Sequence, residues 1–205
     1  MAYDTLADKA AVEKTVASLK ANHFDAIVLD TGAQALGKIK ELIPKGASVM
    51  NGASKTLEKI GYLSYLESGA HGWNNLKAAI LAEKDPLKQA ELRKQSVISD
   101  YYVGSAHALT EDGTILVASN TGSQLPHLAF TSPNVILVVS TKKITRDIAD
   151  AWGRIERHVI PREDERMKEA YGYGTTHAKT LILHRENPSL GRKVLVILVG
   201  EDLGF

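Results

Sequence analysis

Short apolar runs that recur between helical segments constrain the fold of this chain more than any other feature. These runs are "FDAIVLD" (24–30), "ASVMN" (47–51), "TILVAS" (114–119), "NVILVVS" (134–140) and "KVLVILVG" (193–200). Runs of this length without polar alternation are typical of strands that are covered on both faces. The sequence therefore predicts an α/β fold with a mostly parallel sheet and helices on both faces.

The segments between the runs carry apolar residues at helical spacing. The first of these helices follows Asp4, which we expect to be its N-cap, and the second stops at Pro44. Residues 74–99 predict two helices that meet at Asp85-Pro86, and residues 144–159 keep helical phase for several turns. The charged stretch that follows, "PREDERMKEA" (161–170), is interpreted as a solvated helix face.

Two parts of the chain predict an antiparallel element beside the parallel sheet. Residues 101–119 suggest a strand, a tight turn at Glu111-Asp112-Gly113 and a returning strand. The apolar runs 179–187 and 193–200 flank a connection that contains Pro and Gly, which suggests a hairpin or a strand pair.

Length, charge and cysteine content exclude several classes of protein. The 205 residues suit one domain over residues 1–205 rather than two. With 25 Lys and Arg against 24 Asp and Glu, and no basic run, nucleic-acid binding is not expected. The absence of cysteine excludes thiolate nucleophiles and Cys-ligated iron–sulfur or zinc sites within the chain. No apolar run approaches the ~20 residues of a membrane span, so the expected location is the cytoplasm and no membrane partner is expected.

The stretch "MNGASKTLEKIG" (50–61) follows one of these runs and opens a helix. It lacks the glycine spacing of a P-loop, because Val49 and Ser54 stand where that motif needs glycines. What remains is an anion site on free helix amides with Asn51, Ser54, Lys55 and Thr56, or simply a helix that Ser54 caps.

A second polar loop, "SNTGSQLPH" (119–127), follows the run 114–119. The carboxyl ends of parallel strands form ligand clefts, so Asn120, Gly122, Ser123 and Gln124 are candidates for the opposite wall of the same cleft. The alternative is a turn whose side chains bond their own backbone. Glu111 is a candidate base or nucleophile if it is desolvated, or a simple turn residue. The seven histidines show no compact metal-binding spacing, and no cofactor is identified.

Three segments together resemble one known family. They are "NGASKTLEKIGYLSYLES", "ALTEDGTILVASNTGSQLPHLAFTSPNVILVV" and "VLVILVGEDLGF", with Ser54-Lys55-Thr56-Leu57, Glu111 with Gly113-Thr114, and Gly200-Glu201 as the distinctive positions. The combination is similar to the LUD domain, the family of lactate utilization protein C, over almost the whole chain.

The resemblance implies a fold like those of ribose phosphate isomerase, glucosamine phosphate deaminase and the CoA transferases. It also implies a non-redox subunit that binds a small anionic or phosphorylated ligand and supports the oxidation of L-lactate to pyruvate by iron–sulfur partner proteins. The family often has Glu-Thr-Gly-Thr where this chain has Glu111-Asp112-Gly113-Thr114, so contacts of that threonine are not carried over.

Two other functions remain open at this stage. One is a stand-alone isomerase or acyl-CoA transferase-like enzyme that uses Glu111, and the other is an interaction module with a vestigial cleft. The sequence does not show whether the chain catalyses a reaction. A homodimer is expected only because it is the commonest oligomer of soluble proteins.

Overall fold

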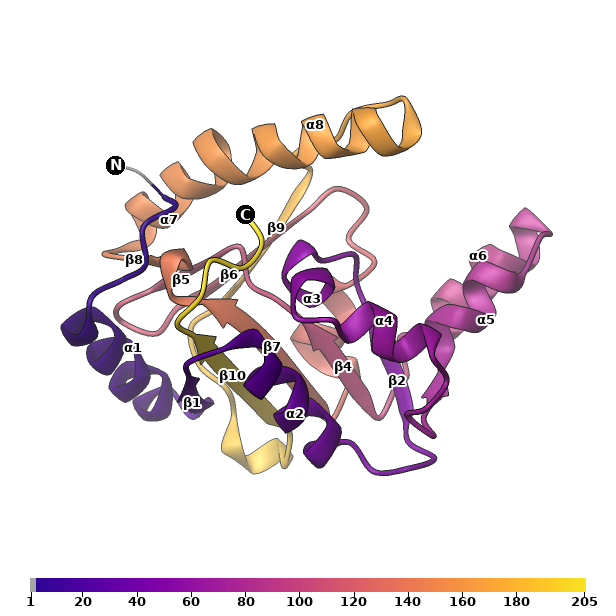
Figure 1. Ribbon diagram of the computed structural model, residues 1–205, viewed down its shortest axis with the longest axis horizontal. Coiled ribbons are helices and arrows are strands. Elements are labelled where there is room, and N and C mark those ends of the chain that lie inside the picture. The colour runs from indigo at the N-terminus through magenta and orange to yellow at the C-terminus, as the bar shows by residue number, and fades with distance from the viewer. Residues whose placement is uncertain (1–2) are drawn as a thin grey trace.

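The computed structural model describes residues 3–205 and contains two sheets (Figure 1). The central sheet has the strand order β1 (Asp25–Leu29), β10 (Lys193–Val199), β7 (Asn134–Ser140), β4 (Tyr101–Gly104), β2 (Ser48–Asn51) and β3 (Asn74–Asn75). Every neighbouring pair in it is parallel. The predicted α/β class with a parallel sheet is therefore confirmed.

The second sheet is the predicted antiparallel element. Its order is β8 (Ile144–Thr145), β5 (Ala108–Thr110), β6 (Ile115–Ser119) and β9 (Lys179–Leu183). β6 pairs antiparallel with both β5 and β9, and the tight turn between β5 and β6 lies where it was predicted, with Gly113 at φ 84°.

The predicted carboxyl-terminal hairpin is wrong. β9 pairs with β6 in the second sheet, whereas β10 lies between β1 and β7 in the central sheet. β10 is apolar on both sides because both of its faces are buried, and a strand of that kind belongs in the middle of a parallel sheet.

Eight α-helices are described within residues 3–205. They are α1 (Lys9–Ala21), α2 (Gly32–Leu42), α3 (Lys55–Lys59), α4 (Tyr62–Glu67), α5 (Leu76–Ala82), α6 (Pro86–Gln95), α7 (Ile148–Arg154) and α8 (Ile160–Tyr171). The cap of α1 is Asp8 rather than the predicted Asp4, since the Asp8 carboxylate accepts from the Ala11 amide. A π-helical turn at Ile155–Val159 joins α7 to α8. Ile144 lies in β8, so the helical segment begins later than its sequence phase suggested.

The layers of the fold follow from three apolar clusters. One face of the central sheet packs against α2, α3 and α4. The opposite face packs against α1 and the second sheet, and α7 covers the far side of that sheet. Helices thus flank both faces, but the second sheet covers much of one of them. In Figure 1, α8 runs along the edge towards which the amino-terminal segment and the carboxyl-terminal residues also extend. Within residues 3–205, no helix combines the length and the apolar character that crossing a membrane would require.

Candidate functional site

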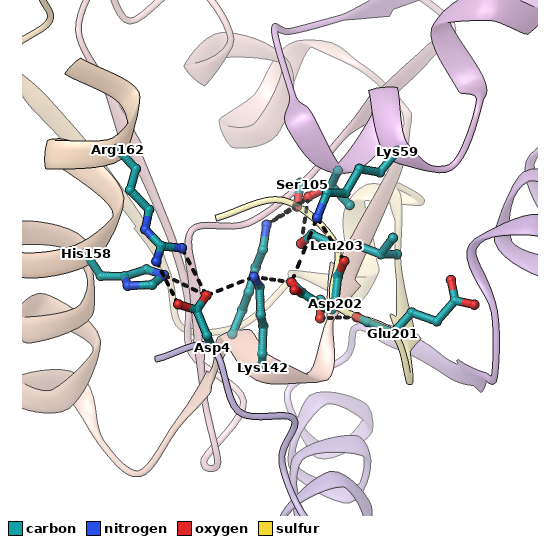
Figure 2. Close-up of polar contacts among 12 residues, drawn as sticks. Asp4, Lys59, Ser105, Lys142, His158, Arg162, Glu201, Asp202 and Leu203 are labelled. Carbon is teal, nitrogen blue, oxygen red and sulfur yellow. Dashed lines mark hydrogen bonds and ion pairs between the residues drawn. The ribbon is translucent and has the colours of Figure 1, made fainter. Parts of the chain in front are cut away.

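The segments that leave four neighbouring parallel strands converge at one edge of the central sheet. Thr56 follows β2, Ser105 follows β4, Lys142 and Lys143 follow β7, and residues 201–204 follow β10. Because the strands are parallel, their carboxyl ends lie at the same edge, where open α/β sheets bind ligands. Figure 2 shows Ser105, Lys142 and residues 201–203 of these segments together with three side chains from the amino-terminal segment and the α7–α8 region.

Lys143 is one of two almost fully buried lysines of this cluster. Its Nζ donates to Thr56 Oγ1 at 2.9 Å, to Ser105 Oγ at 3.1 Å and to the Ala106 carbonyl at 3.2 Å. The side chain therefore ties the ends of three strands together. Burial, reinforced by nearby positive charge, lowers the pKa of Lys143 well below its usual value.

Lys142 lies beside it but has carboxylate partners. Its Nζ is 3.2 Å from Asp4 Oδ1 and also contacts Asp202 Oδ1. Lys142 is almost fully buried, while about half of each partner carboxylate is exposed. The hydrogen bond from Lys142 lowers the pKa of Asp202.

Asp4 lies between Lys142 and two side chains of the α7–α8 region (Figure 2). Arg162 donates two hydrogen bonds to this carboxylate, from Nη1 to Oδ1 at 3.0 Å and from Nη2 to Oδ2 at 2.7 Å. This bond lowers the pKa of Asp4 to about 2. His158 Nε2 is 3.4 Å from Asp4 Oδ1 without hydrogen-bond geometry. Burial lowers the pKa of His158 to about 4, so the ring is neutral at pH 7.

A cavity of about 560 Å³ opens next to this cluster. It is lined by Asp4, Lys55, Glu58, Lys59, Lys142, Arg162, Asp202, Gly204 and Phe205. A smaller cavity of about 270 Å³ shares Lys55 and Arg162 and adds Arg166 of α8. No residue of α8 is fully buried, in agreement with the predicted solvated face, but one side of the helix lines these cavities.

Of the four candidate residues in the first predicted loop, one lines the cavities. Lys55 lines both of them and pairs with Glu58 at 2.8 Å. Ser54 caps α3, since its Oγ accepts from the Leu57 amide. Thr56 is buried under the cavity against Lys143, and Asn51 is buried with its Nδ2 bonded to the Gly52 carbonyl.

The second predicted loop lies beside β9 and outside the residues that line the two cavities. Asn120 donates to Thr175 Oγ1, Gly122 turns the chain at φ 84°, and the Ser123 amide bonds Thr121 Oγ1. Gln124 accepts from Ser119. A Cβ placed on Gly52 would lie 3.8 Å from the Gln124 Cβ, so the two predicted loops adjoin at that point.

Glu111 lies in the β5–β6 turn, where its carboxylate pairs with Lys14 of α1 at 2.8 Å. Its amide donates to the Thr145 carbonyl. It does not line either cavity.

Glu111→Gln is expected to leave the fold and ligand binding intact. An ion pair with a largely exposed lysine stabilises by at most about 1 kcal/mol, so thermal unfolding should move by only a few degrees. An isomerase or acyl-CoA transferase that uses Glu111 would instead lose turnover while it still binds its substrate. Measurements of thermal unfolding, and of turnover with candidate acyl-CoA and sugar phosphate substrates, distinguish a surface ion pair from a catalytic role for Glu111.

Several site residues were not predicted from the sequence, above all Lys142, Lys143, Ser105 and Arg162. A usable signal existed for the lysines, because "TKK" directly follows the buried run 134–140, where a parallel strand delivers its carboxyl end. Within residues 3–205, no group of three or more His, Asp or Glu side chains is placed to hold a metal ion.

The fold and the cluster define an α/β protein with a polar site at the carboxyl edge of a parallel sheet. The chain belongs to the LUD domain family, whose model matches residues 12–199. It is also similar to the crystal structure of a DUF162 family protein from Deinococcus radiodurans, with a TM-score of 0.56 and 16% sequence identity. That similarity covers 96% of this chain and all of the other, and at this identity it shows a shared fold. No curated protein matches the chain in sequence.

Proposed function

We propose that this chain is a non-redox LUD-domain subunit that binds a small anionic ligand in the 560 Å³ cavity. In this proposal it supports the oxidation of L-lactate to pyruvate by iron–sulfur partner proteins. The observation that carries the proposal is that Lys142 and Arg162 converge on a single carboxylate, that of Asp4, at the wall of the cavity.

The geometry around Asp4 is that of a carboxylate receptor. A guanidinium that offers two parallel N–H groups matches the two oxygens of a carboxylate or phosphate. Asp4 belongs to the segment that precedes α1, so a ligand carboxylate can take its position without disturbing a helix or strand. L-lactate and pyruvate are both small carboxylates.

The rest of the cavity supports the same ligand class. Lys55 and Lys59 add two cations to its wall, and the volume lies within the range of small-molecule sites. The absence of cysteine agrees with a subunit that leaves electron transfer to its partners. Of the residues predicted to bind the ligand, Lys55 is the one we place in direct contact with it.

A thermal-shift panel tests the binding. Its members are L-lactate, pyruvate, sugar phosphates, nucleotides and CoA esters, each with wild-type protein and Lys55→Ala. A ligand at about 100 times its dissociation constant adds roughly 2.7 kcal/mol, which is a shift of about 5 to 10 °C for a chain of this size. The shift should be smaller in Lys55→Ala and unchanged in Lys88→Ala, which removes an exposed lysine of α6. If no anion shifts the transition, binding in this cavity is refuted.

Asp4→Asn is expected to bind small anions more tightly than wild type. The substitution removes a negative charge that repels a bound anion next to Lys142 and Arg162. Near a protein surface, repulsion of this kind costs about 1 kcal/mol or more. Its removal should therefore raise the affinity about fivefold or more. The matched control is Asp25→Asn, an exposed aspartate at the amino-terminal end of β1. Titration calorimetry with the best anion of the panel measures the change, and an unchanged or weaker affinity in Asp4→Asn would count against the receptor.

The pathway role has its own test. Deletion of the gene from its source organism should abolish growth on L-lactate, and restoration of the gene should recover it. Normal growth of the deletion strain would remove the pathway role and leave the binding site as a separate question.

A further inference from the structure

Lys143 differs from the other lysines of the site in what surrounds it. It is 4% exposed, and its ammonium contacts two hydroxyls and a carbonyl. Lys142, by contrast, has two carboxylate partners. Within the part of the chain that the structure describes, no carboxylate comes within ion-pair distance of Lys143.

Burial has the largest effect in lowering the pKa of Lys143, and three cations, Arg154, Lys142 and Lys59, lower it further. A buried ammonium without a counterion is unfavourable, and lysines in such places release their proton and become nucleophilic amines. Burial and charge therefore both favour the neutral amine of Lys143, which carries a lone pair.

Gly204 lies close to both this amine and the 560 Å³ cavity. Gly204 lines the cavity, and a Cβ placed on it would lie 3.3 Å from Lys143 Nζ. We therefore expect a displacement of residues 203–205 to open a path from the cavity to the amine.

We propose that Lys143 is a nucleophilic amine that forms an imine with the carbonyl carbon of a small oxo acid, or of a similar anionic carbonyl compound, bound in the cavity. The anionic group of this substrate rests on the proposed function, because it would take the position of the Asp4 carboxylate beside Lys142 and Arg162. The assignment of Lys143 as a nucleophilic amine does not depend on the proposed function.

The reaction is a condensation that needs no further reactant. The lone pair of Nζ forms a bond to the carbonyl carbon, and the carbonyl oxygen takes up a proton. The proton comes from Nζ, so the product of this step is a carbinolamine. The carbinolamine then loses its hydroxyl group and the remaining hydrogen of Nζ as water, and a C=N bond remains. Thr56 Oγ1 and Ser105 Oγ lie within hydrogen-bond distance of Nζ and can pass these protons.

Reductive trapping tests the proposal. Wild-type protein is incubated with pyruvate and sodium cyanoborohydride, and the adduct is located by peptide mass spectrometry. We expect Lys143 to be labelled more than about tenfold above Lys59, because each unit by which a lysine pKa falls raises its neutral fraction tenfold at pH 7. Lys59 is a suitable internal reference, since its side chain is 49% exposed and lines the same cavity.

Lys143→Arg is the matched variant, since it keeps a long side chain with hydrogen-bond donors but cannot form an imine. It should lose the adduct. Because the adduct is located in wild-type protein, the test does not depend on whether the variant folds. Labelling spread evenly over exposed lysines, or no labelling at Lys143, would overturn the proposal and leave Lys143 as a link between three strand ends.

Parallel arms separate this inference from the proposed function. Pyruvate binding is followed by thermal shift in the same samples, and propionaldehyde serves as an uncharged carbonyl probe. Binding of pyruvate without an adduct at Lys143 from either probe overturns the imine and leaves the anion site in place. An adduct from propionaldehyde without pyruvate binding supports the amine and counts against the anion site.

Discussion

Leu57→Ala is expected to lower the free energy of unfolding by about 2–5 kcal/mol. Leu57 is fully buried on α3, in the apolar cluster that joins α2, α3 and α4 to one face of the central sheet. Truncation leaves a cavity that this short helix cannot close by shifting, because Ser54 fixes its start and Gly61, at φ 79°, follows its end. The midpoint of thermal unfolding should fall by roughly 5 to 15 °C.

The matched control is Leu87→Ala on α6. Leu87 is 83% exposed, and α6 has no buried residue. The same truncation should therefore change the unfolding free energy by less than about 0.5 kcal/mol. Equal effects of the two substitutions would contradict the packing of α3 against the sheet. Because α3 carries Lys55 and Thr56, Leu57→Ala should also weaken anion binding, whereas Leu87→Ala should not.

The fold was predictable as far as local patterns determine it. Four of the five apolar runs form strands of the central sheet, namely β1, β2, β7 and β10, whereas the run 114–119 forms β6 of the second sheet. Asp85-Pro86 marked the start of α6, and Ser54 was recognised as the cap of α3. The partner of a strand is not a local property. β9 and β10 are neighbours in sequence, yet they pair in different sheets because β10 is buried on both faces and β9 is only partly buried.

The site was less predictable for the same reason. Lysines at a strand end ordinarily reach solvent, and nothing in "STKK" shows that Asp4 and residues 201–204 close over them. Asp4 resembled a helix cap because an aspartate before a helical segment usually is one. In the structure Asp8 takes that role, which leaves the Asp4 carboxylate for Arg162 and Lys142. The amino-terminal segment, α8 and the residues after β10 come together only in three dimensions.

Gly204→Ala is expected to destabilise the protein by about 2.5–5 kcal/mol. Gly204 has φ 71°, where a Cβ costs roughly 1–2 kcal/mol. The new Cβ would also overlap Thr56 Oγ1 and lie 3.1 Å from the Thr56 amide nitrogen. The protein can relieve this overlap by moving residues 203–205 outwards, but that exposes Leu203, which is now 5% exposed. Exposure of a buried leucine costs about 1.5–3 kcal/mol.

Gly191→Ala is the control that separates the effect of backbone strain from the effect of steric overlap. Gly191 has a similar φ of 66°, and a Cβ placed on it meets no atom within 4 Å. This control should therefore show only the backbone effect, about 1 kcal/mol, in a denaturant titration run beside Gly204→Ala. If the two variants lose the same stability, Gly204 does not pack against Thr56 as the structure describes.

The same pair of variants bears on Lys143. Residues 203–205 lie next to both the amine and the cavity. If their displacement in Gly204→Ala opens a path to the amine, reductive labelling of Lys143 by pyruvate should rise although the protein is less stable. Gly191→Ala should label at the wild-type rate. A rise in both variants would indicate general loosening of the fold, whereas a rise confined to Gly204→Ala would mean that residues 203–205 control access to the amine.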